Sequence, residues 1–351
     1  MRNLLFVTLA AIVMGAMAVS CGGDSTGNGS NESGNNSATT TNNRGIDSTT
    51  VDNTDPNDSL INDTTGVNPT EDMNTASFKE AKRKALLIGI SSYKDKSWGK
   101  INSGNDIALL KSTLTSDLGF EVVVCTEGKA THQGIINAFE ALIKKCQPGD
   151  TVIVHFSGHG QQMVDVVGDE TDGRTEAFIA YDAEKTCSDD PDGYRGQCHF
   201  KDDEMHKYIT KLRKQLGKDG YLLVSLDACH SGGGSRAASG SSGRVVRGTN
   251  EIFGYGILEP AKKIGRTVAG TIGNANYVAI SACQPSEKNY EVFRNGKNYG
   301  SLSFILNDKL LIVKSGKLKL DQLATAIKGE TSYWSNLEQT PFIDNNDENV
   351  Q

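Results

Sequence analysis

The chain has 351 residues and carries 36 basic against 43 acidic side chains, a formal net charge of −7 at neutral pH. This negative balance, without a long basic run, argues against nucleic acid as a partner. The length is enough for one domain with a sizeable core, once the polar N-terminal part is set aside.

Residues 1–20 have the pattern of a secretory signal peptide, with a positive charge at Arg2, an apolar stretch and then small residues. Cys21 comes next, in the stretch AVSCGG, which resembles the lipobox of bacterial lipoproteins. The resemblance implies lipidation of Cys21 and a lipid-anchored protein of the bacterial cell envelope, on the periplasmic or surface side of the outer membrane. Val19 stands where a small residue is more usual, and an ordinary secretory peptide with an incidental cysteine is the alternative.

Residues 21–77 are rich in Asn, Thr, Ser, Gly and Asp. Such a segment has too little apolar surface to offset the entropy lost on ordering, so a disordered tether is predicted. Residues 78–351 are then left for one folded domain, which we expect to be a monomer.

Strand and helix patterns alternate along this domain. Short apolar runs predict buried strands, and apolar residues at helical spacing predict amphipathic helices. The predicted elements are, in chain order, a strand over 84–90, a helix over 105–120, a strand over 120–125, a helix over 132–146, a strand over 150–156, a strand or hairpin arm over 176–182, a helix over 202–216, strands over 220–228 and 276–283, and helices over 301–314 and 320–330.

The alternation predicts an α/β fold with a mostly parallel central sheet and helices on both faces. In such sheets, reactive and ligand-binding groups gather beyond the carboxyl ends of the strands. Three stretches follow strands in this way: Asn105–Asp106, SGHG at 157–160 and DACHSG at 227–232. We therefore expect them to share one edge of the sheet.

A histidine and a cysteine stand at two of these places. His159 lies between two glycines, and Cys229 is followed by a glycine-rich loop. A Cys–His pair makes a nucleophile, because the imidazole takes the thiol proton and later protonates the leaving amine. The backbone N–H groups of Cys229 and Gly160 are candidates for an oxyanion hole. Taken singly, each residue has a plain structural alternative, a small buried hydrophobe for the cysteine and a hydrogen-bonded spacer for the histidine.

At these residues the chain resembles the metacaspases, in particular the prokaryotic orthocaspases. The stretches KALLIGISSY, NDI, VHFSGHG, GDETDG, KDDEMH, LDACHSG and ISAC occur in the order that this family has them. The resemblance implies a caspase-like fold and a cysteine endopeptidase with His159 and Cys229 as its dyad. It also implies protein or peptide substrates cleaved after Arg or Lys rather than after Asp.

The resemblance further implies a carboxylate-lined slot for the basic side chain. Its positions match Asp106, Asp227, Ser157 and Ser103. Carboxylates suit such a slot because they can hold a guanidinium through a bidentate contact. Asp227 lies two residues before Cys229, so both side chains point to the same side of a strand. For Asp106, the cap of a helix N-terminus is the alternative.

Many metacaspases need calcium, which is held by several oxygen ligands. Asp172, Asp202 and Asp203 match part of the family's acidic site, so calcium is a candidate cofactor. A further acid of that site, just past the nucleophile, is absent from CHSGGGSR. The alternative for Asp202 and Asp203 is a pair of acids at a helix N-terminus, where the helix dipole favours them.

The seven cysteines and the arginine-rich loop allow two more predictions. Cys187 and Cys198 flank a polar loop that a disulfide could close, although spacing alone does not establish a bond. The Gly- and Ser-rich loop over 232–248 carries three arginines near the nucleophile. An enzyme that cuts after Arg could process itself there, at Arg236, Arg244 or Arg247, or in the basic stretch over 79–85.

Two other readings stay open from the sequence. One is a catalytically silent caspase-like domain that serves as a surface binding module. The other is a clostripain-like or gingipain-like cysteine peptidase, which would also prefer basic residues.

Overall fold

The computed structural model describes residues 82–165, 173–190, 192–230, 244–254, 276–284 and 287–345. All of them belong to the second of the two units into which the chain divides, Met73–Gln351. Several predictions fall outside the described residues: those for residues 1–20, Cys21, the tether over 21–77, the basic stretch at 79–81, Asp172 and Arg236.

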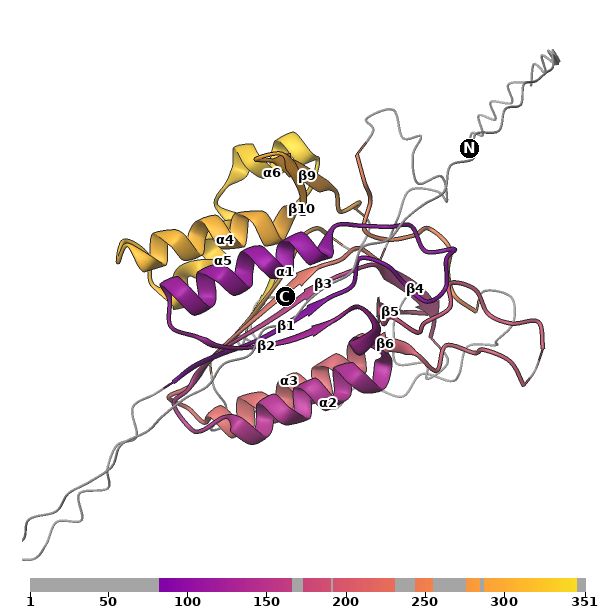
Figure 1. Ribbon diagram of the computed structural model, residues 1–351, viewed down its shortest axis with the longest axis horizontal. Helices are drawn as coiled ribbons and strands as arrows, with labels where there is room; N and C mark the ends of the chain where they lie inside the picture. Colours follow the sequence, from indigo (N-terminus) through magenta and orange to yellow (C-terminus); the bar gives the residue numbers. More distant parts are fainter. Residues whose placement is uncertain are drawn as a thin grey trace, which may run out of the picture. The chain divides into compact units, whose positions relative to one another are not determined.

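A six-stranded sheet forms the centre of the domain, in the order β11-β8-β7-β3-β1-β2 (Figure 1). Its strands are β1 (Arg83–Gly89), β2 (Glu121–Thr126), β3 (Thr151–Ser157), β7 (Tyr221–Asp227), β8 (Asn276–Ser281) and β11 (Phe342–Asn345). All neighbours pair in parallel except β11, which runs antiparallel to β8. The predicted mostly parallel sheet is confirmed.

Helices cover both faces of this sheet (Figure 1). On one face lie α2 (His132–Lys145) and α3 (Asp202–Leu216), and on the other lie α1 (Ser103–Ser112), α4 (Ser301–Lys314) and α5 (Leu323–Lys328). Alternate residues of β1 supply the two apolar layers: Leu86 and Ile88 pack towards α2 and α3, whereas Ala85 and Leu87 pack towards α1 and α4. Both faces of these strands are buried, which explains why their sequences are continuous apolar runs.

The predicted helices are present, with different ends in two cases. The pattern over 105–120 becomes α1 followed by a π-helical turn, Thr113–Asp117. The pattern over 320–330 becomes a 3-10 turn, Leu320–Gln322, followed by α5. Among the described residues, no helix combines the length and the apolar character needed to cross a membrane.

Several short elements were not predicted. They include β11, β4 (Gly160–Val164) and β6 (His199–Lys201). The last two flank β5 (Arg174–Ile179) in a three-stranded antiparallel sheet, so the predicted strand or hairpin arm over 176–182 is a hairpin arm. The strands β9 (Glu291–Arg294) and β10 (Lys297–Gly300) form a hairpin around Asn295 and Gly296, both with positive φ. An Asn-Gly pair is the usual turn of such hairpins, and its signal was overlooked.

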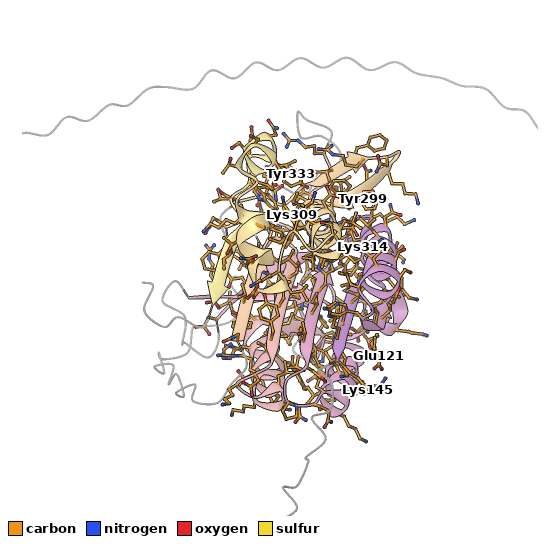
Figure 2. The ribbon with its side chains drawn as sticks, turned by 90° about the vertical axis from the view of Figure 1, so that its left-hand side faces the viewer. Glu121, Lys145, Tyr299, Lys309, Lys314 and Tyr333 are labelled. Atoms are coloured by element: carbon orange, nitrogen blue, oxygen red, sulfur yellow. The ribbon has the colours of Figure 1, made fainter. Side chains whose placement is uncertain are left out.

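The C-terminal part of the chain packs onto the face formed by α4. The helix α6 (Thr331–Leu337) carries Tyr333, whose hydroxyl donates to the backbone oxygen of Ser301 at 2.6 Å. Lys309 of α4 pairs with Glu330, just before α6. Figure 2 labels Lys309 and Tyr333 in this part of the domain. The Tyr333 contact holds the start of α4, which borders the candidate site, and the Lys309 pair holds the helix further along.

Cys187 and Cys198 are free thiols, so the predicted disulfide between them is not formed. The reason is that they pack in different places. Cys187 lies against the small cluster of Met163, Ala177 and Phe253, and its sulfur approaches the Tyr194 carbonyl at 3.5 Å. Cys198 packs against the larger core between the sheet and α2 and α3.

Candidate active site

The register of the sheet brings the histidine and the cysteine to one edge. Ser157, the last residue of β3, pairs with Asp227, the last residue of β7. The backbone N–H of Gly158 then donates to the Asp227 carbonyl at 3.3 Å. His159 comes two residues after Ser157, and Cys229 comes two residues after Asp227. Both therefore lie just beyond the same edge of the sheet.

The imidazole of His159 is buried between two aromatic rings. Its centroid lies 5.3 Å from those of Tyr93 and Trp98, and the Trp98 ring is stacked on it. Its backbone N–H donates to the Tyr93 hydroxyl at 2.7 Å, and its Nε2 lies 2.8 Å from the Gly99 carbonyl oxygen. These contacts hold the ring in one orientation.

The partner of Nε2 decides the tautomer. A carbonyl oxygen can only accept, so Nε2 carries the proton and the lone pair of the neutral ring is on Nδ1. The Nδ1 atom of His159 is buried and has no hydrogen-bond partner within the described part of the chain. Burial lowers the pKa of His159 to about 4, so the ring is neutral at pH 7 and able to accept a proton.

The thiol of Cys229 is directed at a backbone carbonyl. Its Sγ donates to the Glu287 oxygen at 2.7 Å, and the Sγ of Cys283 reaches the same oxygen at 3.6 Å. A hydrogen bond with Cys229, together with burial, raises the pKa of Cys283 strongly. The direct thiol–imidazole hydrogen bond expected from the sequence is not formed with Nδ1, which has no partner among the described residues.

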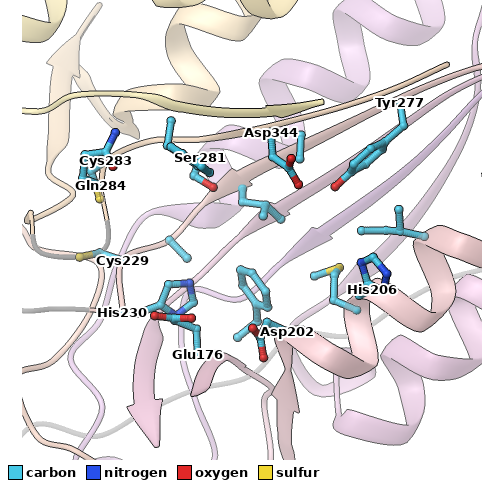
Figure 3. A pocket seen from close by; sticks show the side chains of 17 residues that line it. Glu176, Asp202, His206, Cys229, His230, Tyr277, Ser281, Cys283, Gln284 and Asp344 are labelled. Atoms are coloured by element: carbon cyan, nitrogen blue, oxygen red, sulfur yellow. The ribbon is translucent and has the colours of Figure 1, made fainter. Parts of the chain in front are cut away.

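A cavity of about 270 Å³ borders Cys229 on the α3 side of the sheet. Figure 3 shows Cys229 and Cys283 at one end of this cavity, with Tyr277 and His206 at the other. Asp202 also lines it. The carboxylate pocket described next is on the opposite side, because Asp227 alternates with the cavity-lining residues Leu226 and Ala228 along β7.

Three carboxylates surround one guanidinium on the α1 and α4 side of the sheet. Arg247 is fully buried, and its Nη2 donates to Asp106 at 2.8 Å and to Glu291 at 3.0 Å. Its Nη1 donates to the Ser157 hydroxyl at 2.7 Å and lies 3.9 Å from Asp227. Burial raises the pKa of Asp106 to about 6 even though Arg247 opposes that shift.

The four predicted slot residues differ in their contacts. Asp106 and Ser157 bind the Arg247 side chain directly, and Asp227 forms the longer ion pair. Ser103 is buried close by in α1, but its hydroxyl has no hydrogen-bond partner among the described residues. The helix-cap alternative for Asp106 does not hold, since Asn102 is the N-cap of α1 and the Asp106 carboxylate faces the pocket.

Backbone hydrogen bonds hold Arg247 against the loops that follow β7 and β8, in the way that a bound peptide would be held. The Arg247 carbonyl oxygen accepts from the N–H of Cys229 at 2.8 Å, and the Arg247 N–H donates to the Asn289 carbonyl at 3.0 Å. On the following residue, Gly248 forms an isolated bridge with Gly160. The two residues predicted for an oxyanion hole therefore adjoin the Arg247–Gly248 peptide.

Sequence reasoning missed several residues of this site. Glu291 and Asn289 come from the loop and hairpin after β8, where no motif was recognised. Trp98 and Gly99 lie in a loop without a pattern. Tyr93 ends the KALLIGISSY stretch and could have been noticed there, as an aromatic hydroxyl directly after a strand.

Comparison with known proteins identifies the family. The sequence pattern of the Caspase domain, a peptidase family, matches residues 82–349, which is well over half of the chain. The chain belongs to the caspase-domain family. The predicted resemblance and the caspase-like fold are thereby confirmed.

Individual relatives agree with this assignment. Metacaspase-1A of Aspergillus niger and Metacaspase-1 of Emericella nidulans are each 34% identical to this caspase-domain protein over 161 residues, which are 43% of this chain and 36% of theirs. The chain thus spans little more than a third of these relatives. A solved structure, protein GSU0716 from Geobacter sulfurreducens, shares the fold with a TM-score of 0.50 and 22% identity, over 75% of this chain and 93% of that one.

The calcium ligands expected by resemblance to metacaspases are only partly described. Asp202 and Asp203 open α3, and Asp202 accepts from the Thr175 hydroxyl at 2.8 Å and from the Asp203 N–H at 2.9 Å. Within the described ranges, no cluster of three or more His, Cys, Asp or Glu side chains is placed to hold a metal ion. Asp172, the third residue of the predicted set, lies outside the described residues, so the calcium site stays a prediction.

Proposed function

We propose that this caspase-domain protein is a cysteine endopeptidase that cleaves after Arg or Lys, with Cys229 as nucleophile and His159 as base. One observation carries the proposal. The chain's own Arg247 fills a carboxylate pocket while its carbonyl oxygen accepts from the N–H of Cys229. A substrate in the same position would present its scissile carbonyl next to the thiol.

The charge of the pocket supports the specificity for basic side chains. Asp106, Asp227 and Glu291 are at most 5% exposed, and buried carboxylates are costly without a cation among them. A substrate Arg supplies that cation with a fork of donors, and Lys supplies it as a point charge. An Asp side chain would add a fourth negative charge, so we expect no cleavage after Asp.

The reaction follows from the tautomer of His159. The Cys229 thiol rotates away from the Glu287 carbonyl and transfers its proton to Nδ1, and the sulfur attacks the carbonyl carbon of the basic residue. The N–H of Cys229 stabilises the oxyanion, helped by Gly160. Nδ1 then protonates the leaving amine, and water hydrolyses the thioester. The Gly99 carbonyl stabilises the imidazolium, because Nε2–H points at it throughout.

The same geometry supports self-processing between Arg247 and Gly248. Of the predicted sites, Arg244 lies outside the carboxylate pocket, with its guanidinium over the Tyr290 ring at 4.7 Å. Arg247 lies inside the pocket. Until that bond is cut, Arg247 keeps substrates out, so self-cleavage would also activate the enzyme towards other proteins.

Intact mass analysis tests both parts of this proposal. Wild-type protein should give two fragments, one ending at Arg247 and the other beginning at Gly248, whereas Cys229→Ala protein should stay intact. Fluorogenic peptides ending in Arg, Lys or Asp, with calcium or with chelator, then define specificity and any calcium requirement. Unnicked wild-type protein would reject self-processing, and turnover after Asp would reject the basic specificity while keeping the nucleophile.

The cellular location is a separate proposal, based on residues 1–21. We propose lipid anchoring at Cys21 in a bacterial envelope, because a signal-like segment directly precedes this cysteine. Metabolic labelling with palmitate should mark wild-type protein but not Cys21→Ala. Equal labelling of both would reject lipidation at this residue.

A further inference from the structure

The residues before Arg247 extend the β9–β10 hairpin by one more strand. Val246 forms an antiparallel bridge with Tyr290, and the Glu291 N–H donates to the Val245 carbonyl at 2.9 Å. Together with the Arg247–Asn289 bond, these contacts resemble a peptide added to an exposed sheet edge. In that binding mode the main chain gives affinity and alternate side chains give specificity.

Arg244 occupies a defined place in this added strand. It precedes Arg247 by three residues, and its guanidinium carbon lies 4.7 Å from the centroid of the Tyr290 ring. Its Nη1 also donates to the Leu337 carbonyl at 3.4 Å. A cation over an aromatic face and a carbonyl acceptor are both features that select a positive charge.

We propose that Tyr290 and the Leu337 carbonyl form a second specificity subsite, which takes a basic side chain three residues before the cleaved position. This inference rests on the proposed function, and it adds to the carboxylate pocket a preference for substrates with the pattern basic-x-x-Arg. Once the Arg247–Gly248 bond is cut and residues 244–247 withdraw, the half-buried Tyr290 ring becomes available to such substrates.

Aromatic and aliphatic replacements of Tyr290 test the contribution of its ring without removing its backbone contacts. Tyr290→Phe keeps the ring face, and Tyr290→Leu keeps apolar bulk but loses that face. Both keep the backbone N–H that donates to the Gln339 side chain at 3.2 Å. The substrates are quenched-fluorescence peptides RVVRGTN, AVVRGTN and EVVRGTN, with kcat/KM measured for self-processed enzyme.

The subsite predicts that RVVRGTN is cut about two- to fivefold faster than AVVRGTN, with EVVRGTN slower still. Tyr290→Phe should keep this preference and Tyr290→Leu should abolish it. Equal kcat/KM for the three peptides, or a preference that survives in Tyr290→Leu, overturns the subsite and leaves the proposed peptidase intact.

Binding separates this inference from a failure of the peptidase proposal. If no peptide is cut, the proposed function fails, and fluorescence anisotropy with Cys229→Ala/Arg244→Ser/Arg247→Ser protein decides the subsite. In this triple variant neither the carboxylate pocket nor the Tyr290 ring is occupied by an arginine of the chain itself, so both are open to added peptide. Tighter binding of RVVRGTN than of AVVRGTN supports the subsite, whereas equal binding or no binding overturns it.

Discussion

Replacing Arg247 by Gln tests whether its guanidinium balances the buried carboxylates. Four polar contacts would be lost or weakened, at 2.7, 2.8, 3.0 and 3.9 Å from Ser157, Asp106, Glu291 and Asp227. Removing one partner of a buried ion pair lowers the free energy of unfolding by about 3–5 kcal/mol. Gln can donate to one carboxylate, and the segment can leave the pocket to admit water, so we expect a loss of about 2–4 kcal/mol in the free energy of unfolding at pH 8.

The pH dependence of this loss has a definite sign. In the folded protein the pKa of Asp106 is about 6, above its ordinary value of 3.8, because burial raises it more than Arg247 lowers it. A carboxyl group with a raised folded pKa binds protons more tightly in the folded state, so stability falls as pH rises from about 4 to about 6. Without Arg247 the pKa of Asp106 rises further and the fall continues to higher pH. The loss caused by Arg247→Gln should therefore be smaller at pH 5 than at pH 8.

Urea unfolding of Cys229→Ala and Cys229→Ala/Arg247→Gln proteins at both pH values measures this effect without self-cleavage. Arg244→Gln in the same background is the matched control. Its guanidinium is half-buried outside the carboxylate pocket, so we expect a change below about 1 kcal/mol. Equal unfolding midpoints for parent and Arg247→Gln at pH 8, or a loss that grows towards pH 5, would refute the reasoning.

Three further changes test other parts of the site. Glu291→Gln should lower kcat/KM for Arg peptides about 10- to 30-fold, since one carboxylate of the pocket is neutralised. An unchanged kcat/KM would show that Glu291 does not contribute to binding the substrate Arg. Gly248→Ala should slow self-cleavage about tenfold in a mass-spectrometric time course, because its Cβ would lie 2.2 Å from the Cys229 oxygen. Normal cleavage would show that Gly248 is not confined there. Tyr93→Phe should lower the free energy of unfolding by about 1–3 kcal/mol, because the buried N–H of His159 loses its acceptor; a wild-type urea midpoint would contradict this.

The order of apolar runs and helical patterns was sufficient to predict the reactive edge of the sheet and its strands other than β11. Parallel strands joined by helices present all their carboxyl ends on one side, so the places of Asp106, His159 and Cys229 follow from local patterns alone. These predictions needed no contact between distant segments. The two-residue period expected to place Asp227 and Cys229 on one side ends with β7 at Asp227, whose carboxylate faces α4, whereas Cys229 borders the cavity on the α3 side.

The occupant of the pocket was decided only by the tertiary structure. Arg236, Arg244 and Arg247 are equivalent in a glycine-rich loop, and their local sequence does not say which of them reaches buried carboxylates. Glu291 joins the pocket from a hairpin more than a hundred residues from Asp106 or His159, and the thiol of Cys229 meets the Glu287 carbonyl by loop packing. A periodic pattern encodes which face of an element is buried, whereas charge pairing between loops depends on distances that exist only after the chain has folded.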